Sequence, residues 1–170
     1  VAEAEAALGC FSDLHSSSLQ ERFAAKIGIA GCDPNDWSLM ETLLKVMADG
    51  EADFTLVFRH LPAALESGSD DAVARLFNRP DTIAAWLNDW RARLHDVDRS
   101  EALALRRRSN PVYIPRNQRI EEAIAAGNEG DFAPFHRLNE VLHQPFTERA
   151  EFVEFEAAPA PDEVVHATFC

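Results

Sequence analysis

Apolar residues recur at spacings of three and four along almost the whole chain, and this periodicity constrains the fold more than any other feature. It is clearest in residues 81–94, where Ile83, Trp86, Leu87, Trp90 and Leu94 fall on one side of a helix. No alternation of strand and helix patterns interrupts it. The sequence therefore predicts an all-α protein, an irregular multi-helix bundle of about seven or eight helices.

Capping residues, glycines and prolines divide the chain into short helical segments. After a first helix that ends at Gly28, we expect helices over 33–50, 53–61, 69–79, 81–94, 98–108, 116–126 and 131–143. Gly9 and three consecutive serines weaken the middle of the first helix, so it is either one helix or two. Residues 54–58 also have β-propensity, but the longer spacing pattern favours a helix.

Charge and composition limit the partners of the chain. It has 16 Lys and Arg against 29 Asp and Glu, a formal net charge of −13. Such a chain repels nucleic acid and anionic lipid, and no apolar run reaches the roughly 20 residues that span a bilayer. We expect neither nucleic acid nor a membrane as partner, and a helical domain over 1–146 followed by an extended acidic tail over 147–170.

The first residues already have a helical pattern, and no signal peptide is visible in the sequence. We therefore expect the chain to be part of a longer protein, with a mature processed protein as the alternative. The surface that faced the missing part would be unusually apolar, so we also expect the fragment to form a homodimer.

Three cysteines without metal-binding spacing favour a reducing compartment and hence a cytoplasmic protein. Cys10 and Cys32 have apolar neighbours and are predicted to be small buried side chains. Cys170 is the terminal residue, where chains are usually exposed, and it is the candidate for redox chemistry.

The common catalytic motifs are absent, so the sequence predicts no catalytic, cofactor-binding or metal-ligating residue in this chain. His136 and His143 would lie about two helical turns, or ~10 Å, apart, which is too far to share a metal easily. Paired carboxylates fall at predicted helix starts and polar faces. The Trp86 and Trp90 side chains continue an apolar stripe and are predicted to pack in the core or in an interface.

An island of positive charge stands out between residues 106 and 119, which contain five arginines and no acidic residue. A solvated helix terminus explains Arg106 and its two neighbours. The segment from Asn110 through Tyr113 to Arg116 and Asn117 is bounded by prolines and predicted to be extended. We interpret these four residues as a polar clasp between helices, with phosphate recognition as the alternative.

Several segments together resemble the C-terminal part of the selenoprotein O-like protein adenylyltransferases. The most specific is Asn110-Pro111-Val112-Tyr113-Ile114-Pro115-Arg116-Asn117. Weaker matches in the same order are Lys26-Ile27-Gly28-Ile29, Asp36-Trp37, residues 53–59, Gly130-Asp131, Arg137-Leu138, residues 140–142 and 144–146, with Cys170 at the terminus.

The resemblance implies a protein-kinase-like fold and a pseudokinase that transfers AMP from ATP to hydroxyl side chains of other proteins, using Mg or Mn. This chain would be the helical C-terminal part of such a bacterial enzyme. Its partners would be the missing N-terminal kinase-like part and the protein substrates. The family's nucleotide and metal ligands lie upstream, so no catalytic residue is carried over. Cys170 would match the family's reactive cysteine or selenocysteine.

Two other functions remain open from the residues alone. The first is a stand-alone, non-catalytic helical protein-interaction module, which would show an apolar groove and an exposed face at Trp86 and Trp90. The second is a small metal-dependent hydrolase, which would need a cluster of metal ligands.

Overall fold

A computed structural model describes the backbone of residues 2–31 and 33–165, and the side chains from residue 8 onward within those ranges. Helices and turns make up this part of the chain, and it contains no strand. The predicted all-α class is confirmed.

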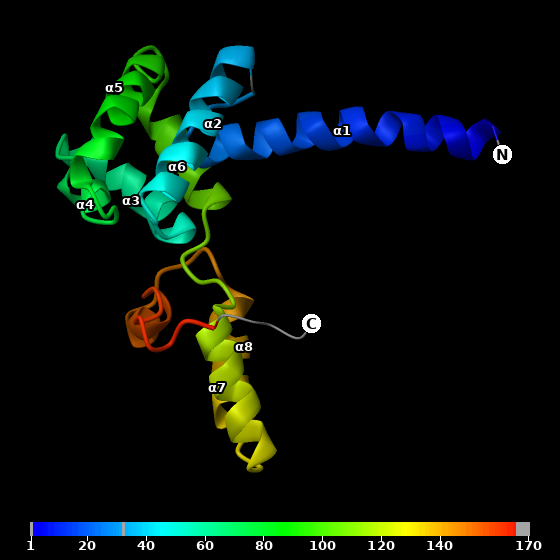
Figure 1. Ribbon diagram of the computed structural model, residues 1–170, viewed down its shortest axis with the longest axis vertical. Coiled ribbons are helices and arrows are strands. Elements are labelled where there is room, and N and C mark those ends of the chain that lie inside the picture. The colour runs from blue at the N-terminus through cyan, green and yellow to red at the C-terminus, as the bar shows by residue number, and fades with distance from the viewer. Residues whose placement is uncertain (1, 32, 166–170) are drawn as a thin grey trace. The chain divides into compact units, whose positions relative to one another are not determined.

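The chain divides into two compact units, residues 1–110 and 111–170 (Figure 1). This division differs from the expected boundary after residue 146. The physical reason is that residues 111–165 build a small core of their own around Tyr113 and Phe152, which are both 1% exposed.

The first unit contains six α-helices and a 3₁₀ helix in its described residues. They are α1 (Ala2–Lys26), α2 (Pro34–Asp49), α3 (Phe54–Ser67), α4 (Asp71–Ala74), η1 (Pro80–Ile83), α5 (Ala84–Arg93) and α6 (Arg99–Ser109). α1 contacts α2 and α6, α2 contacts α5, and α3 contacts α4.

Aspartates begin three of these helices as predicted. Asp33, Asp53 and Asp98 each accept a hydrogen bond from a backbone N–H in the first turn of the helix that follows. α3 continues past Pro62 and ends at Ser67 instead of at residue 61. Its C-cap is Gly68, which has a left-handed φ of 71°. Residues 54–58 are helical, so the spacing pattern decided correctly against a strand.

Two tryptophans form the centre of the first unit's core. Trp86 and Trp90 are 2% and 0% exposed, and their rings stack with centroids 5.6 Å apart. Each indole N–H donates to a backbone carbonyl, Trp86 to Leu39 at 2.8 Å and Trp90 to Ile27 at 2.9 Å. These bonds satisfy the polar end of each ring and tie α5 to α2 and to the end of α1. The predicted core packing of the pair is confirmed.

α1 is one continuous helix, despite Gly9 and the three serines. It extends away from the other helices of the first unit (Figure 1). The prediction that Cys10 is buried is wrong, because α1 has no packing partner within the described chain at this position and Cys10 is exposed. Cys32 lies outside the described residues.

α1 ends where Gly28 was expected to end it, with Lys26 as its last residue. Gly28 has a φ of +86°, and a Cβ atom there would lie 3.1 Å from the carbonyl oxygen of Ala102 and 3.2 Å from the Arg106 side chain. Both the backbone conformation and the close approach of α6 therefore require glycine.

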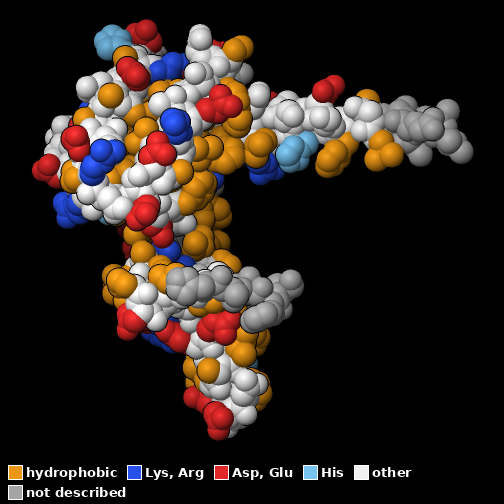
Figure 2. Space-filling model, viewed as in Figure 1, with side chains coloured by type: hydrophobic (Ala, Val, Ile, Leu, Met, Phe, Trp, Pro, Cys, Tyr) orange, Lys and Arg blue, Asp and Glu red, His pale blue; other side chains and the backbone are white. Residues whose placement is uncertain are grey.

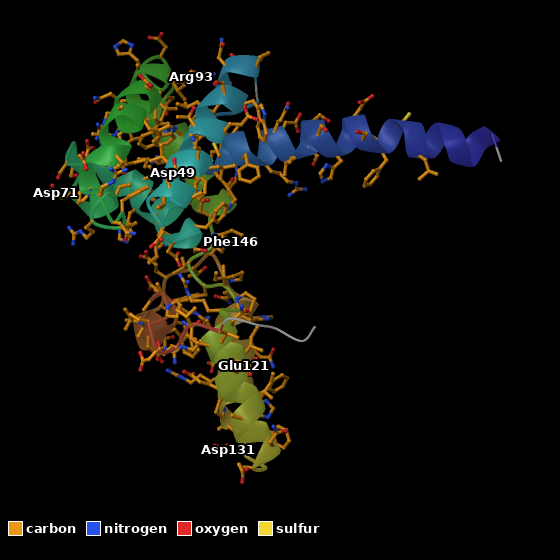
Figure 3. The ribbon with its side chains drawn as sticks, viewed as in Figure 1. Asp49, Asp71, Arg93, Glu121, Asp131 and Phe146 are labelled. Carbon is orange, nitrogen blue, oxygen red and sulfur yellow. The ribbon has the colours of Figure 1, made fainter. Side chains whose placement is uncertain are left out.

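One buried carboxylate joins α2 to α5. Asp36 is 2% exposed and accepts hydrogen bonds from Arg93 Nε at 2.6 Å and Nη2 at 3.1 Å, and from the Asp33 backbone N–H at 3.0 Å. The side-chain hydrogen bond to Asp36 raises the pKa of Arg93 above its usual value. Figure 3 labels Arg93 at the end of α5.

The second unit contains two α-helices that pack against each other, followed by a short 3₁₀ helix. Its elements are α7 (Asn117–Asn128), α8 (Ala133–His143) and the 3₁₀ helix η2 (Ala150–Phe155). α7 and α8 contact each other along their length. Phe135 is 49% exposed, whereas Leu138 and Val141 are buried.

The predicted extended tail differs from the structure between residues 150 and 155. This stretch forms η2, and Phe152 within it is 1% exposed. The acidic composition predicted a solvated, extended segment. Phe152 and Phe155, three positions apart, instead form an apolar side that packs into the core of the second unit.

We predict that Asp36→Asn lowers the free energy of unfolding of the first unit by about 1.5–3 kcal/mol, because it weakens charge-assisted hydrogen bonds in a buried position. All three tryptophans lie in this unit, so urea unfolding followed by tryptophan fluorescence measures it.

The matched control is Asp49→Asn in the same helix. Asp49 forms an ion pair with Lys45 at 3.7 Å, and both side chains are exposed, so the change should be below about 0.5 kcal/mol. Equal effects of the two substitutions would contradict the role given to Asp36.

Candidate functional site

The four predicted clasp residues belong to two separate arrangements. Asn110 is the last residue of the first unit, whereas Tyr113, Arg116 and Asn117 lie in the second. Each arrangement is a set of polar contacts that holds secondary-structure elements of its own unit together.

Asn110 connects the ends of α1 and α6. Its Nδ2 donates to the carbonyl oxygen of Lys26 at 2.9 Å, and its Oδ1 accepts from Lys26 Nζ at 3.2 Å. The same ammonium group donates to the Ser109 carbonyl at 3.2 Å. Because Asn110 is 5% exposed, these contacts satisfy a side chain that would otherwise be buried without partners.

Lys26 is held in an aromatic setting on its other side. Its Nζ lies 5.7 Å from the ring centroid of Phe54 and 5.2 Å from that of Phe58. Burial lowers the pKa of Lys26 below its usual value. The ammonium therefore has a structural role, which the sequence alone did not reveal.

Tyr113 forms the centre of the second arrangement. Its hydroxyl donates to the Arg149 carbonyl at 3.1 Å and accepts from the Arg149 backbone N–H at 2.9 Å. Arg149 Nη2 then donates to the carbonyls of Glu140 at 3.0 Å and Val141 at 2.8 Å, in the last turns of α8. This chain of bonds fixes the start of η2 against the C-terminal end of α8.

Arginines and aromatic rings alternate beside Tyr113. The Phe152 ring has the Arg149 guanidinium 4.2 Å and the Arg137 guanidinium 4.7 Å from its centroid. The Phe155 ring has Arg119 at 5.3 Å and Arg137 at 5.9 Å. We call this set, with Tyr113, the arginine–aromatic ladder.

The ladder arginines also bind the backbone of η2. Arg137 Nη2 donates to the Glu151 carbonyl at 2.7 Å and to Glu154 Oε1 at 3.0 Å. Arg119 Nη2 donates to the Glu154 carbonyl at 3.0 Å. Backbone hydrogen bonding at Glu154, together with the hydrogen bond from Arg137, lowers the pKa of the Glu154 carboxyl. The arrangement uses its positive charge to hold an acidic segment of the same chain.

The remaining two clasp residues differ in their surroundings. Arg116 is 8% exposed and donates from Nη2 to the Glu156 carbonyl at 3.4 Å. Asn117 is the first residue of α7 and is exposed. Thus Tyr113 and Arg116 both reach the segment around η2. Sequence reasoning missed Arg137, Arg149 and Phe152, although the spacing of Phe152 and Phe155 inside an acidic stretch was a usable signal.

The prediction that Arg106 belongs to a solvated helix terminus is wrong. Arg106 is fully buried instead of solvated, and its guanidinium lies 5.0 Å from the Trp90 ring centroid. Its three guanidinium nitrogens have no hydrogen-bond partner among the described residues. Burial lowers the pKa of Arg106 to about 10. The reason is a long-range contact: the approach of α6 to Gly28 encloses the side chain.

Two shallow surface pockets are bordered by arginines. One, of about 290 Å³, is lined by Leu65, by Ala102 and by five residues between Arg91 and Arg99 inclusive. The other, of about 350 Å³, lies at the ladder beside Arg119 and Arg137. These arginines are engaged: Arg91 with Asp70, Arg99 with the Leu65 carbonyl, and the ladder pair as above.

Within the described ranges, no three His, Cys, Asp or Glu side chains gather in a way that suits a metal ion. None of the helices in this part of the chain has the length and apolar character needed to cross a membrane. Cys170, the redox candidate, lies outside the described residues.

We predict that Tyr113→Phe weakens the attachment of η2 by about 1–2 kcal/mol, because it removes both hydrogen bonds of the hydroxyl while keeping the ring. Amide hydrogen exchange in residues 149–155 should then be about 5–30 times faster, measured by mass spectrometry on peptides. Asn117→Ala is the control, since Asn117 is exposed. Unchanged exchange in Tyr113→Phe would show that the hydroxyl does not hold this segment.

The chain matches the family described as "Protein adenylyltransferase SelO" over residues 1–143. A protein nucleotidyltransferase YdiU of Rhodopseudomonas palustris (strain ATCC BAA-98 / CGA009) is 43% identical over 171 residues, which covers 98% of this chain and 35% of that protein. A YdiU of Jannaschia sp. is 44% identical over 86% of the chain and 30% of its own length.

A third relative, the YdiU of Cereibacter sphaeroides (strain ATCC 17023), is 47% identical over 86% of the chain and 29% of its own length. The chain thus spans about a third of the length of these curated relatives. The family match extends from α1 through the whole of α8. The chain belongs to the SelO protein adenylyltransferase family.

Proposed function

We propose that this chain is the C-terminal helical part of a protein adenylyltransferase and that it supports the catalytic part of that enzyme. In the proposed reaction, a protein hydroxyl oxygen attacks the α-phosphorus of ATP. A bond forms between that oxygen and the α-phosphorus, the bond from the α-phosphorus to the bridging oxygen breaks, and pyrophosphate leaves. The hydroxyl proton passes to a base or to solvent.

The single observation that carries this proposal is the family match over residues 1–143, which includes every helix of the first unit and both long helices of the second. The names of the relatives agree with it, because they describe protein nucleotidyltransferases. The sequence contains no phosphate-binding or catalytic motif of the common kinds, so we place catalysis in the two thirds of the polypeptide that the relatives have in addition.

The supporting role has its own structural argument. The buried polar side chains of the described residues mostly contact the chain itself: Asp36 binds Arg93, Asn110 binds Lys26, and Tyr113 binds the Arg149 backbone. Groups used in this way fix helix positions and are not available to a substrate. We accordingly assign ATP, Mg or Mn, and the contacts to protein substrates to the rest of the enzyme.

Two finer parts of the proposal concern the terminus and the cell. Cys170 remains the redox candidate, on the basis of the family resemblance. We place the enzyme in the bacterial cytoplasm, because the relatives are bacterial and the three cysteines show no disulfide pattern.

We predict that the 170-residue chain alone binds no ATP–Mg²⁺ in titration calorimetry, whereas the full-length polypeptide that carries it does. The full-length protein should transfer label to protein from [α-³²P]ATP and not from [γ-³²P]ATP, because AMP transfer retains only the α-phosphate.

Three results would contradict this assignment. Label from the γ-phosphate would indicate a phosphotransferase, and the absence of either label would remove the proposed activity. Measurable ATP affinity of the 170-residue chain would contradict the placement of the nucleotide site outside it.

The second candidate, a stand-alone interaction module, is favoured by one observation, the exposed apolar side chains of α1. The exposed Trp86 and Trp90 face that this alternative would use is not present, because both rings are buried. AMP transfer by the full-length protein would decide against it.

A further inference from the structure

Four large apolar side chains are exposed on one side of α1. Leu8, Phe11, Leu14 and Leu19 are 73%, 66%, 67% and 37% exposed. At about 100° per residue, they fall within an arc of about 140° around the helix. Figure 2 shows hydrophobic side chains along the projecting part of α1. We call these four residues the α1 stripe. A helical stripe of this width normally packs against a partner.

The core of the first unit does not cover the α1 stripe. At the other end of the helix, Ala24 and Ile27 are fully buried in that core. Phe11 points about 140° away from Ala24 and about 160° away from Ile27 around the helix axis. The α1 stripe and the buried end of α1 therefore face nearly opposite directions. A second surface, on the other side of the helix, is needed to remove the stripe from water.

We propose that the α1 stripe is the docking surface for the part of the family's polypeptide that lies outside this chain. This inference rests on the proposed function, which assigns catalysis to that part. The family match begins at residue 1, so α1 belongs to the family's fold and is not an added segment. The match to the Rhodopseudomonas relative covers 35% of that protein, which leaves about two thirds of it to provide the covering surface.

The chemistry of the stripe defines the surface that fits it. Leucine and phenylalanine side chains offer no conventional hydrogen-bonding groups, so burying them is most favourable against apolar atoms, where no polar group of the partner loses its contact with water. The covering surface is therefore an apolar face of the catalytic part, and α1 is the element through which the helical part braces it.

Site-specific labelling tests this proposal without removing any apolar side chain. Ser18 falls inside the arc of the α1 stripe, whereas Ser16 lies outside that arc and about 160° away from Ser18 around the helix. Both serines are exposed. In a background where Cys10, Cys32 and Cys170 are replaced by Ser, we would introduce Ser18→Cys or Ser16→Cys and measure the rate of maleimide labelling, in the 170-residue chain and in the full-length polypeptide.

We expect Ser18→Cys to react at least about tenfold more slowly in the full-length polypeptide than in the 170-residue chain, because docking excludes the reagent. Ser16→Cys should react at a similar rate in both. Equal rates for Ser18→Cys in the two proteins would overturn the proposal. Protection of Ser18→Cys in the full-length polypeptide that grows with protein concentration would also overturn it, since that result assigns the stripe to a second copy.

The readout is separate from that of the proposed function. Full-length protein that protects Ser18→Cys but transfers no AMP would keep the docking surface and refute the activity. Full-length protein that transfers AMP but leaves Ser18→Cys reactive would keep the activity and refute the docking surface.

Discussion

The fold of the second unit depends on one phenylalanine placed between two cations. Phe152 lies within an acidic segment, yet it is 1% exposed because the guanidinium groups of Arg137 and Arg149 lie against its ring. The same arginines donate to backbone carbonyls of η2 and α8, and the carbonyl bound by Arg149 lies in the last turn of α8, where a positive charge is favourable. Without this contact, a segment so rich in glutamate would have little reason to leave water.

The first unit is held by a different kind of contact, in which polar groups are satisfied around a large apolar core. The indole N–H groups of Trp86 and Trp90, and the side chain of Asn110, all bond to backbone carbonyls. Burial nevertheless lowers the pKa values of Lys26 and Arg106. Between the lowered and the usual pKa of each group, at alkaline pH, the unfolded chain binds more protons than the folded chain. Raising the pH through this window therefore makes the contribution of Lys26 and Arg106 to stability more favourable. The chemistry of these residues serves the packing of helices, which is what a supporting part of an enzyme requires.

The sequence predicted the helical class, the aspartate caps and the tryptophan core, because periodicity and capping are local signals. It failed where long-range contacts decide. Arg106 looked like part of a solvated helix end and is buried against Trp90, and Cys10 looked buried although its part of α1 is exposed. The motif led us to propose Tyr113 and Arg116 as part of a clasp. Arg137 and Arg149 lie 24 and 36 positions from Tyr113, and no local sequence pattern predicts their contact with Phe152.

The central claim concerns the second unit, in which residues 111–165 have a core of their own. Hydrogen exchange of the 170-residue chain carrying Phe152→Ala tests this most directly, with Val153→Ala as the control because Val153 is 63% exposed. Removing a buried phenylalanine costs about 3–5 kcal/mol, so exchange should accelerate by at least about a hundredfold in α8 and η2 while α2, α3 and α5 keep their protection. Equal acceleration in both units, or none in the second, would contradict the account.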